Sequence, residues 1–296
     1  MTDRTILPIA LLACAFTLAT TVAAEDAWTV ERLQDELEVE AGWTATNELP
    51  AWTEKPTVLV SLERTYAAGL GGVVPGVNVI EVANISEAMR HAPKANAIFG
   101  FCDAELLEAA PQLSWVFVFH AGVESCPFAE RLSKGDVIVT NFQKLASPAL
   151  GEHAIAMMLA LNRGLPRFKQ AMPAGEWRRD LASQPGMHVV AGRTVLIAGL
   201  GGIGRQAARR AKALGMHVLA TRNSSRDGPD YVDYVGLAHE LPELVQRADV
   251  VINALPLTPA TQGLFDKELL AKFKDGAYLI NIGRGGTIDT DALLAA

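Results

Sequence analysis

The segment from Arg193 to Gly215 constrains the fold of this chain most, because it predicts a strand, a glycine turn and a helix in direct succession. Residues 195–198 form a short apolar run, which is typical of a parallel strand buried on both faces. Glycines then follow as Gly199, Gly201 and Gly204. At this spacing the first permits a tight turn, the second lets a pyrophosphate approach the backbone, and the third lets the helix pack on the strand. The segment therefore predicts a dinucleotide-binding unit.

The helix after this turn carries apolar residues at helical spacing, with small alanines on the face that must pack closely. Its first N–H groups and its dipole favour an anion. A glycine turn without a ligand is the alternative, but the strand before it and the helix after it favour a phosphate site. The residues expected to hold the dinucleotide here are Gly199, Gly201, Gly202, Ile203 and Gly204.

Length and charge limit the classes of function. With 296 residues and 50% hydrophobic content, the chain is long enough for two domains of ordinary size. Its net charge of -7, without a basic stripe, argues against a nucleic-acid partner. No spacing of histidines and cysteines predicts a metal site.

Residues 1–24 resemble a secretory signal peptide, with an apolar stretch from Thr5 to Val22 and small residues before a cleavage point after Ala24. We therefore expect an exported, periplasmic protein. An uncleaved membrane anchor is the alternative, because the apolar run approaches the roughly 17 residues that can span a bilayer. Export is unusual for an enzyme that uses a dinucleotide.

The cysteines decide little at this stage. Cys14 lies within the predicted signal peptide, which leaves Cys102 and Cys126 in the mature chain. The two could pair in an oxidising compartment, but two cysteines do not make a disulfide framework. Two free, partly buried thiols are the expected state.

The first half of the chain alternates apolar strands with short helices, which predicts a parallel α/β layer. We assign this layer to a first domain, residues 25–145. The strands are expected at 58–60, 77–82, 97–99, 115–119 and 137–140, and the helices at 86–91 and 104–110.

A helix over residues 149–161 is predicted to open the second domain, residues 146–296, with Ser147 as its cap and Pro148 in its first turn. This helix is apolar on almost every side, which predicts that it is buried, with His153 as a hydrogen-bonded core histidine. Further strands are expected at 216–220, 249–253 and 277–281. Together with the opening segment they predict a Rossmann-type, doubly wound parallel sheet.

Several short pieces, taken together and in this order, resemble the D-isomer-specific 2-hydroxyacid dehydrogenase family. The pieces are residues 120–124, 151–154, 199–204, 253–258 and 281–285. The resemblance implies that the first domain is a flavodoxin-like substrate domain and that the second binds a nicotinamide cofactor. It also implies that the substrate, a small 2-oxo or 2-hydroxy acid, lies between them and that the protein is a homodimer through the cofactor domain.

The resemblance also assigns roles to single residues. Arg284 matches the family's catalytic arginine, and a guanidinium suits that role because it holds a carboxylate with two parallel hydrogen bonds. Ala121, Gly122 and Val123 match the loop whose N–H groups meet the substrate carboxylate. His120 is expected to be a rim or structural residue, with a role as proton donor as the alternative. Further cofactor contacts are implied at Leu255, Pro256, Ile282 and Gly283.

Cofactor choice is predicted from the end of the second strand of this sheet. An acidic residue there would bind the adenosine ribose of NAD and repel a 2′-phosphate. This chain instead has Arg222, with Thr221 and Ser224 as neutral donors, and Arg226 further on as a solvated loop charge. NADP is therefore the expected cofactor and NAD the alternative.

The expected reaction is hydride transfer between NADP(H) and C2 of the acid, with a histidine as proton donor or acceptor. In the family the glutamate and histidine of the acid-base pair follow residues 285–289, and this chain ends at Ala296. We therefore expect an incomplete version of a competent enzyme, with the cofactor sheet incomplete at its C-terminal side. A non-catalytic dinucleotide-binding or interaction protein is the first alternative. A relative that acts on formate or phosphite is the second.

Overall fold

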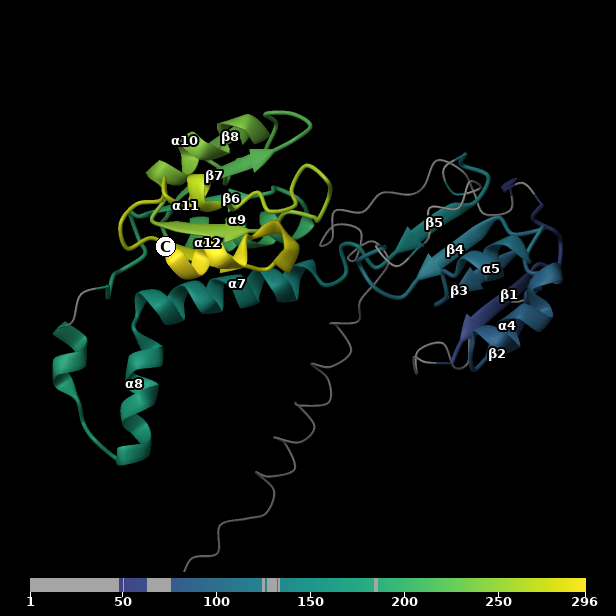
Figure 1. Ribbon diagram of the computed structural model, residues 1–296, viewed down its shortest axis with the longest axis horizontal. Helices are drawn as coiled ribbons and strands as arrows, with labels where there is room; N and C mark the ends of the chain where they lie inside the picture. Colours follow the sequence, from purple (N-terminus) through teal and green to yellow (C-terminus); the bar gives the residue numbers. More distant parts are fainter. Residues whose placement is uncertain are drawn as a thin grey trace, which may run out of the picture. The chain divides into compact units, whose positions relative to one another are not determined.

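The structure is a computed structural model that describes residues 48–49, 51–62, 76–123, 126, 132, 134–183 and 186–296. The described residues form two parallel sheets of five strands each, with helices packed on them (Figure 1). The predicted signal peptide lies outside the described residues. Within them, no helix is both long enough and apolar enough to cross a membrane.

The first sheet confirms the predicted flavodoxin-like architecture. Its strands are β1 (Thr57–Ser61), β2 (Asn78–Val82), β3 (Ala97–Phe99), β4 (Trp115–Val118) and β5 (Ile138–Asn141). They are parallel and lie in the order β2-β1-β3-β4-β5, which is the flavodoxin order. In such a sheet the ligand end is the edge at which the strands end.

The two faces of the first sheet are covered differently. Helices α4 (Ile85–His91) and α5 (Ala104–Glu108) pack on one face, around buried residues such as Ile98 and Leu106. Each helix is capped at its start, α4 by Asn84 and α5 by Asp103. The opposite face carries aromatic rings in edge-to-face contact, including Phe99 with Trp115 at 4.8 Å and Phe117 with Phe142 at 4.9 Å between ring centroids.

The second sheet confirms the Rossmann-type prediction. Its strands are β6 (Thr194–Ala198), β7 (His217–Arg222), β8 (Tyr234–Leu237), β9 (Val250–Asn253) and β10 (Tyr278–Asn281), all parallel in the order β10-β9-β6-β7-β8. The order reverses between β6 and β9, and that switch point is where such sheets bind ligands. The sequence analysis missed β8, a four-residue edge strand whose apolar pattern is interrupted by Gly236.

Helices cover both faces of the second sheet, as a doubly wound fold requires. One face packs against α7 (Ser147–Asn162) and α9 (Gly202–Ala213). The other packs against α10 (Leu241–Leu244) and α11 (Lys267–Leu270), and α12 (Thr290–Ala295) follows β10. Because α7 packs with this sheet, the chain near residue 146 already belongs to its layer. The exact domain boundary stays a prediction.

Helix α7 corrects three expectations. Its N-cap is Ala146, and Ser147 is instead a buried residue of the first turn. The helix is buried on one side only, where Gly151, Ala154 and Met158 face α9 and the sheet, so His153 is exposed rather than in the core. The sequence did not reveal which side of α7 is exposed, because that side includes small residues, and small residues occur at both buried and exposed positions.

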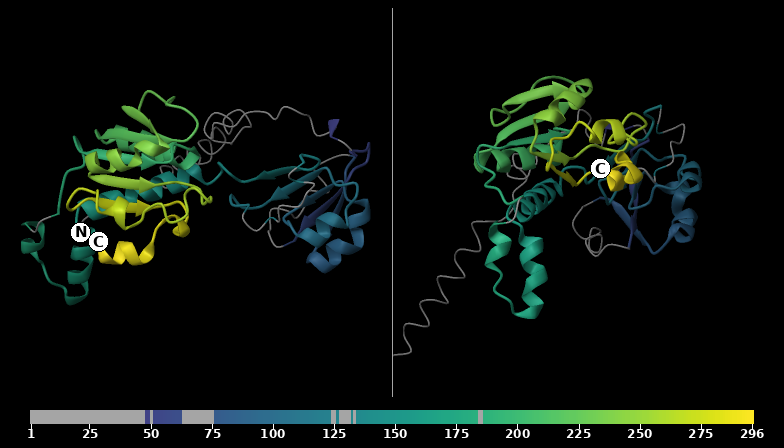
Figure 2. Two further views of the ribbon diagram at one scale, coloured as in Figure 1. Left: turned by 45° about the horizontal axis from the view of Figure 1, so that its top comes forward. Right: turned by 60° about the vertical axis from the view of Figure 1, so that its left-hand side comes forward.

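A helical arm, defined here as residues 164–183, follows α7 and projects away from the second sheet (Figure 2). It comprises α8 (Leu165–Ala171) and the short 3-10 turns η3 (Met172–Ala174) and η4 (Arg179–Ser183). Its large apolar residues are unusually exposed, with Met172 at 73% and Trp177 at 86%.

The expectation of free thiols is wrong. Cys102 and Cys126 form a disulfide, with their Cα atoms 5.0 Å apart. Cys102 follows β3, and Cys126 belongs to the connection after β4. Because β3 and β4 are parallel neighbours, the segments that follow them meet at the same edge of the sheet. A separation of 24 residues in sequence gave no sign of this pairing.

Candidate functional site

The glycine turn at the end of β6 has the steric build that the sequence predicts. Gly199 has a φ of +96°, and a Cβ there would lie 3.1 Å from the Ala254 carbonyl oxygen. A Cβ on Gly204 would lie 2.1 Å from the Gly199 carbonyl oxygen, so α9 can pack this closely on the strand only with glycine. Among the residues that the structure describes, no heavy atom beyond the chain neighbours of Gly201 lies within 4 Å of the equivalent point on that glycine. That open side is where the predicted pyrophosphate would approach.

Helix α9 begins at this open side with 12 residues and no side-chain cap. The first N–H groups of an α-helix have no partner inside the helix, so those of Gly202 and Ile203 are available to a ligand. Lys144, which precedes α7, passes beside them: its Cγ lies 3.4 Å from the point where a Cβ on Gly202 would stand. Lys144 could not be predicted from the sequence, because 58 residues separate it from Gly202 and only the packing of α7 on α9 brings it there.

The end of β7 places the predicted selectivity residues in different environments. Arg222 donates from Nη1 to the Asp227 carbonyl at 3.1 Å, which holds its guanidinium in the loop after the strand. Thr221 is only 3% exposed, and its hydroxyl accepts from the N–H of Gly199 at 3.3 Å. Ser224 is exposed. Thr221 therefore stabilises the glycine turn, and its role toward a phosphate stays a prediction.

Arg226 is exposed, as the sequence suggests, but it also has a charged partner. It forms an ion pair with Glu240, Nη2 to Oε1, at 2.8 Å. The Tyr234 hydroxyl also donates to Glu240, and together with the N–H of Leu237 and with Arg226 it lowers the pKa of Glu240 to about 2. Arg226 thus pairs with Glu240 at the surface, whereas Arg222 is the last residue of β7.

A buried amide links the ends of β9 and β10. The Asn253 side chain is fully buried, and its Nδ2 donates to Asn281 Oδ1 at 3.1 Å and to Thr287 Oγ1 at 2.7 Å. Its Oδ1 accepts from the N–H of Leu255 at 3.1 Å, while Asn281 Oδ1 accepts from the N–H of Gly283 at 3.0 Å. The amide pair therefore fixes two loops that are predicted to contact the cofactor.

These loops also meet directly. A Cβ on Gly283 would lie 2.6 Å from the Leu255 carbonyl oxygen, so a side chain there would push the loops apart. Leu255 and Ile282 are half-buried and Pro256 is exposed. The cofactor contacts implied at these positions stay predictions, but the residues lie at one edge of the sheet with the glycine turn, because β6, β9 and β10 are parallel.

Arg284 follows β10 on the same edge. Its carbonyl oxygen accepts from Thr287 Oγ1 at 2.7 Å and from Asn281 Nδ2 at 3.4 Å, and the residue is exposed. The backbone of Arg284 is thus held by the same buried network that holds the cofactor loops. Asn253 and Asn281 lie in motifs that the sequence singled out, but nothing in the sequence indicated that they bond to each other or to Thr287.

The predicted substrate loop, Ala121 to Val123, lies at the end of β4 in the first sheet. His120 is exposed, and its ring Nδ1 donates to the Gly122 carbonyl at 2.6 Å, which agrees with the structural role favoured for it. Asn141 Nδ2 donates to the Ala121 carbonyl at 2.7 Å. In the part of the chain that the structure describes, the N–H groups of Ala121, Gly122 and Val123 have no acceptor.

Comparison with known proteins decides the family. Residues 155–296 match the family model described as D-isomer specific 2-hydroxyacid dehydrogenase, NAD binding domain. The chain belongs to the D-isomer-specific 2-hydroxyacid dehydrogenase family. The family resemblance drawn from the sequence is therefore confirmed, and the second sheet is a nicotinamide-dinucleotide-binding domain.

Individual members of the family are similar over most of the chain. D-3-phosphoglycerate dehydrogenase of Mycobacterium tuberculosis (strain ATCC 25618 / H37Rv) is 33% identical over 256 residues, which are 81% of this chain and 46% of that protein. Glyoxylate reductase of Thermococcus onnurineus (strain NA1) is 36% identical over 199 residues, 66% of this chain and 59% of that protein. The chain thus spans about half the length of the curated relatives it matches.

Solved structures of the family agree. A D-isomer specific 2-hydroxyacid dehydrogenase family protein from Aeromonas salmonicida subsp. salmonicida A449 has a TM-score of 0.69 and 28% identity, covering 82% of this chain and 77% of that one. A glyoxylate reductase from Paecilomyes thermophila has a TM-score of 0.66 and 25% identity, covering 82% and 78%. The matched NAD binding domain contains the second sheet, and the edge at which β6, β7, β9 and β10 end, where the predicted cofactor residues lie, is called the cofactor edge below.

Proposed function

We propose that this family member transfers a hydride between NADPH and C2 of a small 2-oxo acid, giving the D-2-hydroxy acid, and the reverse. The observation that carries the proposal is the shared polar network beneath the cofactor edge. Asn253 and Asn281 hold the loops of Leu255 and Gly283, and with Thr287 they also hold the backbone of Arg284. Because the backbone of Arg284 and the two loops share this network, it supports the proposal that Arg284 binds the substrate carboxylate next to the cofactor.

Each part of the site has a separate task in this reaction. The N–H groups at the start of α9, with Lys144 beside them, would bind the pyrophosphate. The Arg284 guanidinium would hold the substrate carboxylate in two parallel hydrogen bonds, which orients C2 for reaction. The free N–H groups of the Ala121 to Val123 loop would bind the same carboxylate. Bound NADPH supplies the hydride.

The substrate class follows from the chemistry of the site and from relatives named glyoxylate reductase and glycerate dehydrogenase. Both names denote two- or three-carbon acids with oxygen at C2. We therefore propose glyoxylate or hydroxypyruvate as the acid reduced, with pyruvate as the next candidate. A planar carboxylate next to C2 is the feature that Arg284 would recognise.

We propose NADP rather than NAD as the cofactor. Arg222 is the last residue of β7, where an acidic residue would favour NAD, and the Asp227 carbonyl holds its guanidinium in the loop that follows. A fixed guanidinium binds a phosphate better than a mobile one, because less side-chain entropy is lost. NAD stays the alternative.

Fluorescence titration and a turnover screen test the proposed function together. The full chain is titrated with NADPH and with NADH, and glyoxylate, hydroxypyruvate and pyruvate are then offered with the cofactor that binds more tightly. We expect the chain to bind NADPH, and we expect a version extended by the family's glutamate and histidine to reduce at least one acid, with Arg284→Met abolishing turnover while leaving NADPH affinity unchanged. Cofactor binding without turnover of any acid would instead support the non-catalytic dinucleotide-binding protein.

We also propose that the protein is a homodimer. The exposed Leu165, Met172 and Trp177 of the arm support this, because exposed large apolar residues on one projecting element are typical of an interaction surface. Light scattering after gel filtration tests it. We expect a dimer that Trp177→Ser weakens, whereas a monomeric wild-type chain would contradict the proposal.

We further propose that the protein is exported to the periplasm by residues 1–24. The Cys102–Cys126 disulfide supports an oxidising location, because disulfides persist there and are rare in the reducing cytosol. Cell fractionation with and without residues 1–24 tests the proposal. Recovery of the intact chain in the cytosol would contradict it.

A further inference from the structure

The loop from Ala121 to Val123 has all of its carbonyl oxygens held from outside the loop. Asn141, the last residue of β5, donates to the Ala121 carbonyl at 2.7 Å. The His120 ring donates to the Gly122 carbonyl at 2.6 Å, and the N–H of Cys126 donates to the Val123 carbonyl at 2.9 Å. Because each peptide unit points its N–H and its C=O in opposite directions, a held carbonyl fixes where the next N–H points. The bonds from Asn141 and His120 therefore set the direction of the N–H groups of Gly122 and Val123, and the bond from Cys126 holds the last carbonyl of the loop in place.

One of these donors is held covalently. Cys126 is 8% exposed and belongs to the buried cluster of the first sheet, and its sulfur is bonded to that of Cys102. Cys102 is anchored in turn, because it lies directly before Asp103, whose carboxylate caps α5 through the N–H of Leu106 at 3.0 Å. The disulfide thus links Cys126, whose N–H holds the Val123 carbonyl, to the residue that precedes the N-cap of α5.

We propose that the Cys102–Cys126 disulfide is a redox-dependent positioning element of the substrate loop, so that the oxidised chain binds the substrate carboxylate and the reduced chain binds it poorly. The proposal rests on the proposed function, in which the N–H groups of Ala121 to Val123 bind that carboxylate. The proposed cofactor site is the glycine turn on the second sheet, whereas both cysteines follow strands of the first sheet, so cofactor binding should not depend on the disulfide.

The chemistry of the switch is a simple exchange. A dithiol reductant gives up two electrons and two protons, the S–S bond breaks, Cys102 and Cys126 become thiols, and the reductant ends as a cyclic disulfide. The N–H of Cys126 is then no longer tethered to α5. In the reduced chain, the loop must be ordered again each time an acid binds, which weakens binding by about 5- to 30-fold if the cost equals that of fixing roughly one residue.

Binding of oxamate, a 2-oxo acid analogue that hydride transfer does not reduce, provides the test. Calorimetry measures oxamate binding to the full chain loaded with NADPH, in the oxidised state, after reduction with dithiothreitol, and in the Cys102→Ser/Cys126→Ser variant. We expect oxamate to bind the last two about 5- to 30-fold more weakly, with NADPH affinity unchanged within about twofold.

The possible results distinguish a failure of the redox proposal from a failure of the proposed function. Equal oxamate affinity in all states would overturn the switch and leave the proposed function standing. Absence of oxamate binding in the oxidised chain, with NADPH bound, would overturn the carboxylate role of the loop and the switch together. If reduction of the wild type and the double variant both abolish NADPH binding as well, the disulfide stabilises the whole chain, and its specific role in the loop is refuted. Asn141→Leu, which releases the Ala121 carbonyl but keeps the disulfide, should weaken oxamate binding in the same range.

Discussion

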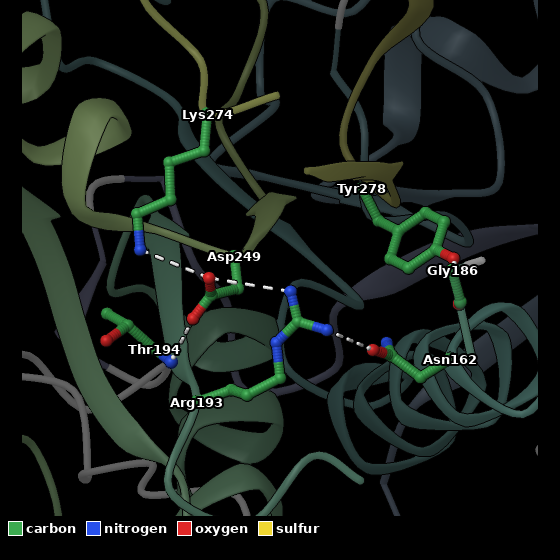
Figure 3. A network of polar contacts seen from close by, with 7 residues as sticks. All are labelled: Asn162, Gly186, Arg193, Thr194, Asp249, Lys274 and Tyr278. Atoms are coloured by element: carbon green, nitrogen blue, oxygen red, sulfur yellow. Dashed lines mark hydrogen bonds and ion pairs between the residues drawn. The ribbon is translucent and has the colours of Figure 1, made fainter. Parts of the chain in front are cut away.

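The two edges of the second sheet are built in opposite ways. At the edge where the strands begin, Asp249 before β9 accepts from the N–H of Thr194 at 2.8 Å and pairs with Lys274 at 3.1 Å and with Arg193 at 3.4 Å (Figure 3). Arg193 also donates to Asn162 of α7 at 3.3 Å. At the edge where the strands end, glycines and neutral amides connect the loops, and two arginines, Arg222 and Arg284, lie at the ends of β7 and β10.

Charge pairing and open backbone serve different purposes at these edges. At the first edge Asp249, Arg193 and Lys274 satisfy one another, so that edge has little left to offer a ligand and holds the strand starts together. At the second edge, the side of Gly201 where a Cβ would stand is open among the described residues, and side chains such as Asn253 are buried beneath the surface. We infer that one edge of the second sheet mainly stabilises the fold and that the opposite edge mainly binds the cofactor. Substitutions at the two edges should therefore separate the two properties.

Gly204→Ala should have the largest effect, because it damages both properties at once. The new Cβ would lie 2.1 Å from the Gly199 carbonyl oxygen, so α9 must move away from β6. We expect a loss of about 3 kcal/mol in the free energy of unfolding, the upper range for overpacking, and roughly a hundredfold weaker NADPH binding. Gly201→Ala is the matched control, since nothing surrounds that point. It should weaken binding without changing the denaturation midpoint.

Asp249→Ala should reduce stability alone. It leaves Arg193, Lys274 and the N–H of Thr194 without their common partner, and breaking a partly buried pair of this kind costs about 2–4 kcal/mol. Urea denaturation measures the loss, and NADPH titration should show an affinity within about twofold of wild type. A large fall in NADPH affinity would show that the two edges are coupled, and it would contradict the separation of stability from binding.

Asn253→Leu tests the residue that joins the two properties at the cofactor edge. The leucine keeps the volume but leaves Asn281, Thr287 and the N–H of Leu255 short of a partner, at a cost of about 1–3 kcal/mol. Because the network also holds the Arg284 backbone, we expect kcat with glyoxylate to fall more than NADPH affinity. Thr287→Val, which removes one donor to the Arg284 carbonyl, should give a smaller fall in kcat with the same sign. Equal effects on kcat and on NADPH affinity would contradict a positioning role.

Arg222→Ser should change cofactor choice with no effect on stability. A hydrogen-bonded charge pair with a phosphate is worth about 1.5–3 kcal/mol, so NADPH affinity should fall by about 10- to 150-fold while NADH affinity stays constant. Arg226→Ser is the matched control, because that arginine pairs with Glu240. If the control lowers NADPH affinity as much as Arg222→Ser does, Arg222 is not the selectivity residue.

Lowering the pH should give the smallest change in the free energy of unfolding, and the change should arise at Asp249, on the edge where the strands begin. Burial disfavours the charged form of Asp249, but the N–H of Thr194 with Lys274 and Arg193 outweighs it and lowers the pKa of this carboxyl. A lowered pKa stabilises the fold above the unfolded value, near 3.9, and this contribution is lost as the pH falls through the folded value. The stability difference between wild type and Asp249→Asn should therefore shrink below about pH 4. A difference that stays constant down to about pH 2.5 would contradict this assignment.

Sequence patterns predicted most of the strands because each depends on a local property. The apolar run before Gly199 and the alternation in the first half of the chain became β6 and β1 to β5 with small shifts at the ends. The predictions were wrong or incomplete where the outcome depends on residues that are distant in the sequence. β8 is a short edge strand that, among the described strands, pairs with β7 alone. His153 is exposed because α7 is buried on one side only.

The sequence by itself determined the strand, glycine turn and helix of the cofactor edge and the family to which the chain belongs. It could do so because a tight turn and close helix packing require glycine at fixed spacing, whatever the rest of the chain does. Only the tertiary structure decided the disulfide, the place of Lys144 beside α9, and the network of Asn253, Asn281 and Thr287. Those contacts join residues that lie 24 to 58 positions apart and meet only once parallel strands and packed helices bring their ends together.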